Sequence, residues 1–239
     1  MKRDIKTHGQ HFMRGSDFIA ELIGHSNIRK NDTVLDIGAG SGAISDVLAR
    51  RAKYVVAYEP EKNAAAKLRS NIGHRTNVKI IEKDFLSAEL PSDPYKVFSN
   101  IPFHLSSKIV RKLVTAERAP KAIYLIVQKQ FAQKMITSGD HFHGALGMAI
   151  APWWVARIRR PLRKTDFTPP PAVDTVLLEL KPREESLLPA GKAEDYMLFV
   201  ERCFAEPLFY RTVSSGAIKP SQLALEKWVA LFTRVYSKD

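Results

Sequence analysis

Residues 33–42 read TVLDIGAGSG, a short apolar run that ends in alternating glycines. The apolar run predicts a buried strand, and residues 43–52 that follow have the pattern of a helix. Glycines at 38, 40 and 42 let the backbone turn sharply between the two and let a ligand approach the main chain. The stretch therefore predicts the first strand, turn and helix of a nucleotide-binding α/β fold.

The same strand and helix alternation continues along the chain. Strand 54–58 ends in Glu59, about twenty residues after the glycines, where such folds place a carboxylate for a ribose diol. Strand 78–82 leads to Asp84, which can hydrogen-bond a base edge, and to Phe85, which can cover its face. Further strands are predicted at 95–99, 122–127 and 173–180, the last in an antiparallel edge hairpin. This order predicts a mostly parallel sheet with its ligand crevice at the carboxyl ends of the strands.

A ligand that meets Glu59 in this way carries an adenosine, and two cofactors of that kind are S-adenosylmethionine and NAD. The glycine turn reads GAGSGA and lacks the G-x-x-G spacing that seats a pyrophosphate on a helix N-terminus. S-adenosylmethionine has no phosphate and needs no such seat. The sequence therefore favours S-adenosylmethionine over NAD.

A second motif, Asn100-Ile101-Pro102-Phe103, follows the predicted strand 95–99. A side-chain amide, a rigid proline and an aromatic ring in four residues can grip a flat ring that bears an amine. The other interpretation is a proline turn that ends a strand, with Phe103 in the core.

The composition favours a nucleic-acid partner. The chain has 37 Lys and Arg against 25 Asp and Glu, a formal net charge of +12. The longest apolar run, residues 145–156, is too short to span a bilayer, so no membrane partner is expected. No apolar signal segment follows the first residues, and the single Cys203 excludes an internal disulfide, so a cytoplasmic location is expected. No metal site is expected, because His8 and His11 lack an accompanying cluster of ligands.

Two groups of cations are candidates for RNA contacts, although the group on the predicted helix could equally be a solvated face. One group lies on the predicted helix 106–116 and the other follows a pair of tryptophans; together they comprise Lys108, Arg111, Lys112, Arg157, Arg159, Arg160, Arg163 and Lys164. Phe167 comes next, ahead of three prolines. The composition changes at Pro182, after which two amphipathic helices are predicted.

Taken together, these motifs resemble the ribosomal RNA adenine N6-dimethyltransferases, and within them most closely the Erm type. The motifs are GQHF at 9–12, DIGAGSG at 36–42, the acids at 59 and 84, NIPF at 100–103, and Phe167 ahead of the prolines. The resemblance implies a Rossmann-like class I methyltransferase domain at 1–181 and a small all-helical domain at 182–239. It also implies N6-methylation of an adenine in 23S ribosomal RNA, and with it resistance to macrolide, lincosamide and streptogramin B antibiotics.

The resemblance also assigns roles to residues. Asn100 and the Ile101 carbonyl would accept hydrogen bonds from the adenine amine, with Pro102 holding the turn, Phe103 stacking on the base and Phe167 covering its other face or a neighbour. The cofactor would be held by His11, Met13, Gly38, Gly40, Glu59, Asp84, Phe85 and Asn100. The family commonly has Asn where His11 stands and Tyr where Phe103 stands.

Three alternatives stay open at this point. A KsgA-like enzyme dimethylates adjacent adenines of small-subunit RNA; it usually has Leu where Ile101 stands and a larger C-terminal domain. A methyltransferase-fold protein that binds RNA without chemistry would have no need of an intact NIPF motif. A methyltransferase of small molecules or DNA is disfavoured by the net charge and the resemblance respectively. The expected substrate is unassembled or partly assembled large-subunit RNA, and the expected state is a monomer.

Overall fold

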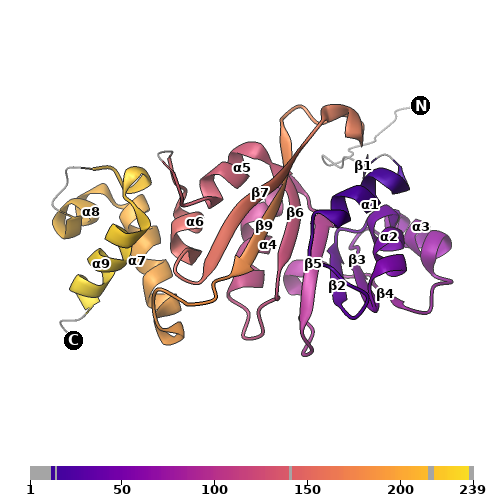
Figure 1. The fold of residues 1–239 in the computed structure, drawn as a ribbon, viewed down its shortest axis with the longest axis horizontal. Helices are drawn as coiled ribbons and strands as arrows, with labels where there is room; N and C mark the ends of the chain where they lie inside the picture. Colours follow the sequence, from indigo (N-terminus) through magenta and orange to yellow (C-terminus); the bar gives the residue numbers. More distant parts are fainter. Residues whose placement is uncertain (1–11, 14, 140–141, 215–217, 237–239) are drawn as a thin grey trace. The chain divides into compact units, whose positions relative to one another are not determined.

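One mixed sheet of seven strands organises the chain in the computed structural model, which describes residues 12–13 (the backbone only for Phe12), 15–139, 142–214 and 218–236. The strand order is β4-β3-β2-β5-β6-β9-β7 (Figure 1). The strands are β2 (Thr33–Ile37), β3 (Tyr54–Tyr58), β4 (Val78–Ile81), β5 (Tyr95–Asn100), β6 (Ile123–Gln128), β7 (Trp154–Leu162) and β9 (Thr175–Pro182). A separate two-stranded sheet pairs β1 (Phe12–Met13) with β8 (Phe167–Thr168).

The parallel part of the sheet follows from the apolar runs in the sequence. Parallel pairs join β4 to β3, β3 to β2, β2 to β5 and β5 to β6. Strands covered on both faces are apolar throughout, and Val34, Leu35 and Val97 are all fully buried. The expected Rossmann-like sheet is confirmed.

Helices alternate with these strands along the chain (Figure 1). They are α1 (Ser16–Gly24), α2 (Ala43–Arg51), α3 (Lys62–Ile72), α4 (Ser106–Val114), α5 (Lys129–Met135), α6 (Ala145–Ile150), α7 (Ala193–Ala205), α8 (Pro207–Ser214) and α9 (Leu225–Tyr236). Helix α3 begins at an N-cap, Glu61, whose carboxylate accepts hydrogen bonds from the backbone N–H groups of Asn63 and Ala64.

The chain divides into two compact units, each described here by itself. The first comprises the described residues of Met1–Lys129 and Arg159–Leu178, and the second those of Gln130–Ile158 and Glu179–Asp239. Strands β7 and β9 contribute residues to both. The second unit thus contains α5 and α6 as well as the C-terminal helices, so its limits differ from the expected division at residue 181. A catalytic domain that ends at residue 181 stays a prediction.

Aromatic side chains form the core of the second unit. The ring of Phe199 packs against Trp228 and Phe232, with centroid distances of 6.1 and 5.7 Å, and Tyr196 packs edge-on against Phe232 at 5.2 Å. The predicted apolar faces of the two amphipathic helices therefore face a core. None of the helices in the described part of the chain is long and apolar enough to cross a membrane.

Candidate active site

The topological switch point of the sheet lies between β2 and β5, because the chain adds strands outward from β2 on one side and from β5 on the other. The glycine turn and the NIPF motif both lie at this point. Strands β2 and β5 run parallel, with Thr33 opposite Tyr95 and Leu35 opposite Val97. Their carboxyl ends are tied together because the backbone N–H of Ile37 donates to Ser99 Oγ at 2.7 Å. The crevice at such a switch point is where open α/β sheets bind ligands. Ser99, which sequence reasoning did not single out, therefore helps to place Asn100 beside the glycine turn.

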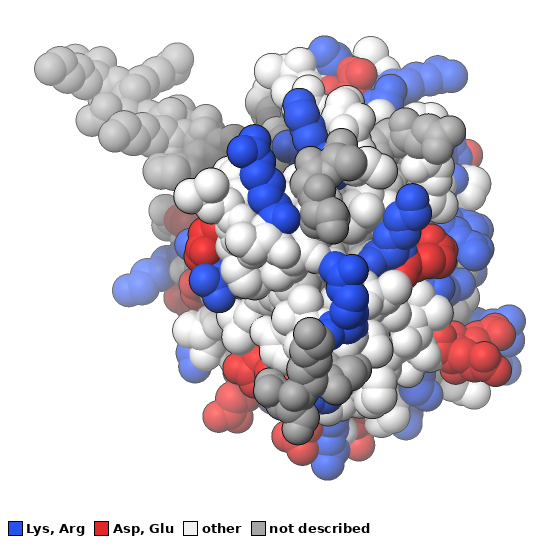
Figure 2. All heavy atoms as spheres, turned by 90° about the vertical axis from the view of Figure 1, so that its left-hand side faces the viewer, with Lys and Arg blue, Asp and Glu red and all other residues white. Residues whose placement is uncertain are grey.

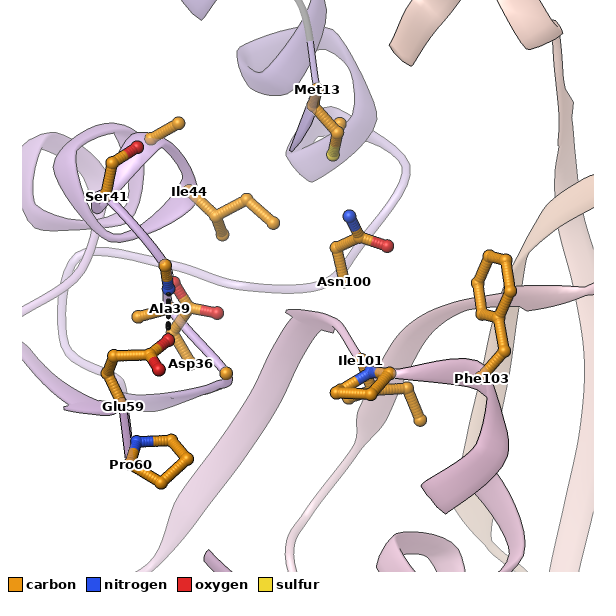
Figure 3. Close-up of a pocket in the computed structure, with 14 residues that line it drawn as sticks. Met13, Asp36, Ala39, Ser41, Ile44, Glu59, Pro60, Asn100, Ile101 and Phe103 are labelled. Carbon is orange, nitrogen blue, oxygen red and sulfur yellow. Dashed lines mark hydrogen bonds between the residues drawn. The ribbon is translucent and has the colours of Figure 1, made fainter. Parts of the chain in front are cut away.

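A pocket opens at this junction (Figure 3). Its lining combines the glycine turn, the end of β3, the NIPF motif and one residue of β1: Met13, Asp36, Gly38, Ala39, Gly40, Ser41, Ala43, Ile44, Glu59, Pro60, Asn100, Ile101, Pro102 and Phe103. Eight of the predicted site residues thus surround one space, namely Met13, Gly38, Gly40, Glu59, Asn100, Ile101, Pro102 and Phe103. The structure brings together motifs that lie up to ninety residues apart in the sequence.

The glycine turn makes this close approach possible. Gly38 and Gly40 have φ values of 71° and 57°, which residues with a Cβ rarely adopt. A Cβ on Gly38 would lie 3.5 Å from Pro102 Cδ, so the turn already touches the second motif. The backbone N–H groups of Gly38 and Ala39 both donate to the carbonyl of Tyr58, at 2.9 and 3.0 Å. These bonds fix the turn against the end of β3.

Glu59 is buried at the wall of the pocket, with 2% of its surface exposed. Its Oε2 accepts a hydrogen bond from the Gly40 N–H at 2.8 Å (Figure 3). Its Oε1 accepts one from the Glu61 N–H at 2.9 Å. These two backbone bonds fix the position of the carboxylate at the end of β3 on the pocket wall.

Asp36 is a second buried acid in the lining, and the sequence analysis gave it no role. It is 1% exposed, its Oδ2 accepts from Ser45 Oγ at 2.7 Å, and its Oδ1 has no hydrogen-bond partner. Burial raises the pKa of the Asp36 carboxyl to about 7; the bond from Ser45 opposes this rise and the charge of Glu59 adds to it. A carboxylate within the apolar strand TVLDI was the signal that could have identified it.

The NIPF motif forms the wall opposite the glycine turn. Ile101 is 2% exposed, whereas Asn100 and Phe103 are half-buried and border the pocket. Phe103 begins the short helix η2 (Phe103–Leu105), and its carbonyl accepts a hydrogen bond from Ser106 Oγ at 2.8 Å. In Figure 3 the Asn100 side chain points toward Met13, and the ring of Phe103 lies on the side of Asn100 away from Ile44. Phe103 does not belong to the closed core, against the alternative interpretation of this stretch.

Two predicted cofactor residues lie outside the pocket lining. Asp84 is exposed, and its carboxylate accepts from the Leu86 N–H at 3.0 Å to cap the short helix η1 (Phe85–Ser87). Phe85 is 3% exposed and packs edge-on against Tyr58, with ring centroids 5.3 Å apart. Their contact with a cofactor stays a prediction. His11 lies outside the described residues.

Phe167 differs most from its expected role as a cover for the base. Its side chain is 0% exposed, belongs to the hydrophobic core of the first unit, and does not line the pocket. Burial of a Phe side chain is worth about 1.5–3 kcal/mol, and stacking on a base about 1–3 kcal/mol. The two contributions are of similar size, so the structure shows Phe167 as a core side chain and its stacking on a base stays a prediction.

Known proteins resemble this chain in sequence and in fold. The family model for ribosomal RNA adenine dimethylases matches residues 1–218. The chain belongs to the ribosomal RNA adenine dimethylase family. The expected family is therefore confirmed.

Two relatives of this dimethylase-family chain are ribosomal RNA methyltransferases by name, and one of the names states the small subunit. The mitochondrial ribosomal RNA small subunit methyltransferase of Arabidopsis thaliana is 30% identical over 84% of this chain and 53% of its own length. The rRNA adenine N-6-methyltransferase of Bacillus licheniformis is 31% identical over 75% of this chain and 62% of its own length. The chain thus spans about half of the first relative and less than two thirds of the second.

Among solved structures, the 23S rRNA methyltransferase ErmE aligns with a TM-score of 0.78 at 27% identity. The alignment covers 93% of this chain and 98% of that one. The dimethylase-family chain therefore shares its fold with a solved 23S rRNA methyltransferase over nearly its whole length.

Several of the predicted RNA-contacting cations have structural partners in this dimethylase-family chain. Lys112 Nζ donates to the carbonyls of Leu86 and Ala88 and lies 5.2 Å from the ring centroid of Phe85, and desolvation lowers its pKa. Arg160 pairs with Glu21 and lies over the ring of Phe18. These two side chains anchor η1 and α1, and their expected role as RNA contacts stays a prediction.

Arg163 and Lys164 lie at the loop that follows β7. The Arg163 N–H donates to Asp166 Oδ2 at 2.7 Å, and Lys164 Nζ donates to the Ala172 carbonyl at 2.9 Å. The side chain of Lys164 thus closes the base of the loop that carries β8. Both residues are exposed, so a contact of Arg163 with RNA stays a prediction.

The remaining predicted cations, Lys108, Arg111, Arg157 and Arg159, are exposed. Arg157 shares a surface groove with two further cations, Lys181 and Arg183, and with three acids, Glu179, Glu184 and Glu185. Figure 2 shows Lys and Arg side chains spread over the face that it displays. RNA contacts of Lys108, Arg111, Arg157 and Arg159 stay a prediction.

Proposed function

We propose that this chain transfers methyl groups from S-adenosyl-L-methionine to N6 of an adenine in ribosomal RNA. The observation that carries the proposal is the convergence of the glycine turn, Glu59 and the NIPF motif on one pocket at the switch point of the sheet. A chain that only binds RNA would have no need for these groups to converge.

The pocket fits the proposed cofactor. Among the described residues that line it, none is Lys or Arg, whereas two are buried acids, Asp36 and Glu59. A lining without cations suits a ligand without phosphate, which favours S-adenosylmethionine over a dinucleotide. Glu59 and Gly40 would hold the ribose side, and Asp36 Oδ1 offers a buried acceptor that lacks a protein partner.

The cofactor supplies an electrophilic methyl group, so the task of the protein is orientation more than proton removal. The amine of adenine is a weak nucleophile because its lone pair is delocalised into the ring. Asn100 Oδ1 and the Ile101 carbonyl would accept hydrogen bonds from this amine and direct its lone pair. Phe103, half-buried at the rim, would stack on the base. A base inside a helix must first leave it, so unpaired or weakly paired RNA is the expected substrate.

For the target we propose 23S ribosomal RNA, unassembled or partly assembled, with macrolide, lincosamide and streptogramin B resistance as the consequence. The support is the alignment with ErmE over 98% of that chain and the Ile at position 101. A second candidate is small-subunit RNA, favoured by the similarity to the Arabidopsis small subunit methyltransferase.

The test uses purified protein, radiolabelled S-adenosylmethionine, and protein-free 23S and 16S RNA, with the Asn100→Ala variant as control. We expect label in 23S RNA that is lost in the variant, and a reverse-transcription stop at one site. Label confined to adjacent adenines of 16S RNA would replace the proposed target with the second candidate. Bound RNA without label would indicate a binding protein. Expression in a susceptible bacterium then tests macrolide resistance.

A further inference from the structure

The two-stranded sheet β1-β8 places an early residue of the chain at the pocket. In its antiparallel register Met13 lies opposite Phe167, and Phe12 lies opposite Thr168. Residues opposite each other in such a pair have side chains on the same face, close enough to touch. Met13 also lines the pocket, so one residue of this sheet contacts the ligand space and its partner does not.

A pair of two-residue strands has too few hydrogen bonds to hold itself in place. Burial has to fix its position. Phe167 is 0% exposed and Met13 9%, and both belong to one core cluster with residues of α1 and β9. Phe167 is thus the member of the pair that is embedded in the first unit, and Met13 rests against it.

The loop that presents Phe167 is tied independently of β1. Lys164 Nζ donates to the Ala172 carbonyl at 2.9 Å, which closes the loop at its base. Asp166 Oδ2 accepts from the Arg163 N–H at 2.7 Å in the turn just before β8. Strand β8 therefore has its own supports and can serve as the template on which β1 is placed.

We propose that Phe167 is a positioning residue for the cofactor pocket: its buried ring holds β1 in register, so that Met13 forms one wall of the space for S-adenosylmethionine. The inference rests on the proposed function, because it assigns the pocket to that cofactor. It gives Phe167 a role in cofactor binding and none in stacking on the RNA base.

The test measures the dissociation constant of S-adenosylmethionine by calorimetry, well below the melting temperature of every variant. Phe167→Ala and Met13→Ala are each expected to weaken binding about tenfold. The double variant is expected to be no weaker than either single one, because both remove the same wall. Phe167→Leu, which refills most of the core volume, is expected to restore binding.

The matched control is Leu177→Ala on β9. Leu177 is also 0% exposed and in the same core cluster, but it does not line the pocket. This variant is expected to lower the melting temperature and to leave the dissociation constant unchanged, which separates positioning from a general loss of stability.

Hydrogen exchange supplies a readout that does not depend on the cofactor. Exchange at the Met13 amide is expected to accelerate in Phe167→Ala and not in Leu177→Ala. Unchanged exchange and cofactor binding in Phe167→Ala, with a raised KM for RNA, would overturn the inference in favour of stacking. Wild-type protein that binds no S-adenosylmethionine would instead overturn the proposed function. Exchange at the Met13 amide of Phe167→Ala that is as slow as in the wild type would, by itself, refute the role of Phe167 in holding β1.

Discussion

The Glu59 carboxylate accepts a hydrogen bond from the backbone N–H of Gly40 at 2.8 Å, across the mouth of the glycine turn. The acid at the end of β3 therefore supports the turn that follows β2 in addition to facing the pocket. Any change at Glu59 acts on both the charge and the shape of the proposed cofactor site.

Glu59→Gln is expected to weaken S-adenosylmethionine binding about tenfold or more. Both carboxylate oxygens accept from backbone N–H groups, and an amide can replace only one of them. Calorimetry measures the effect, and RNA affinity without cofactor is expected to stay unchanged. The control is Glu61→Gln, which alters the N-cap of α3 and not the pocket. Equal cofactor affinity in both variants would contradict the assignment of Glu59.

Asp36→Asn is expected to change how the stability of the cofactor-free protein depends on pH. The folded protein raises the pKa of Asp36 from 3.8 to about 7, so it favours the protonated acid. This stabilisation is complete below the unfolded pKa and is lost as pH rises through the folded value. A shift of about three units corresponds to at most about 4 kcal/mol.

Urea unfolding of both proteins between about pH 4 and pH 8 measures this difference. The wild type should lose stability relative to Asp36→Asn across that range, because the Asn side chain does not ionise. Titrations common to the two proteins cancel in the difference. Parallel stability curves would show that Asp36 titrates alike in the folded and unfolded chain.

Phe103→Ala is expected to lower kcat/KM for RNA roughly 5- to 150-fold, which corresponds to the loss of about 1–3 kcal/mol of stacking. Phe103→Tyr keeps an aromatic ring at the half-buried rim and is expected to retain activity. Steady-state methylation of RNA distinguishes the two. A similar loss in both variants would exclude stacking as the role of the ring.

Lys108 and Lys112 lie on the same helix and are expected to behave differently. Lys108 is exposed, and Lys108→Ala should reduce the slope of log affinity against log salt by roughly 0.7–0.9. Lys112 donates to the carbonyls of Leu86 and Ala88, so Lys112→Met should lower the melting temperature and leave the slope unchanged. RNA binding at several salt concentrations checks both; a reversed pattern would restore Lys112 as an RNA contact.

The adjacent Arg159 and Arg160 form a similar comparison on β7. Arg160 Nη1 lies 3.0 Å from His25 Nε2 and also pairs with Glu21, so Arg160→Ala should loosen α1 and reduce stability. Arg159 is exposed on the other face of the strand, and its replacement by Ala should affect the salt dependence of RNA binding instead. Thermal melting of the two variants measures the expected loss of stability, and RNA titrations at several salt concentrations measure the expected change in salt dependence.

The predicted site residues that the structure brings together at one pocket lie at the ends of parallel strands. Gly38, Glu59 and Asn100 each follow an apolar run, and the topology of a parallel sheet brings such ends to one edge. Local patterns were enough there because the sheet itself supplies the long-range order. Asp36 was missed because a strand pattern shows that a residue is buried and not what it faces.

The environment of a side chain is not visible in the sequence where it depends on distant pairing. Phe167 resembled a free aromatic ring, but its antiparallel pairing with β1 and the core beneath it decide its burial. Lys112 and Arg160 belonged to basic clusters in the sequence, yet each meets carbonyl or carboxylate oxygens from a segment far along the chain. Nothing in the neighbouring residues encodes those partners.

The pairing of β1 with β8 has a consequence for the order of synthesis. Met13 is synthesised well before the strand that positions it, which ends at Thr168. The glycine turn, Glu59 and the NIPF motif are all complete by residue 103. Contacts of such high sequence separation form late in folding. The wall at Met13, synthesised before the other groups of the pocket, is thus the last to be built, and a chain stalled before Phe167 would carry Glu59 and the NIPF motif around an open site.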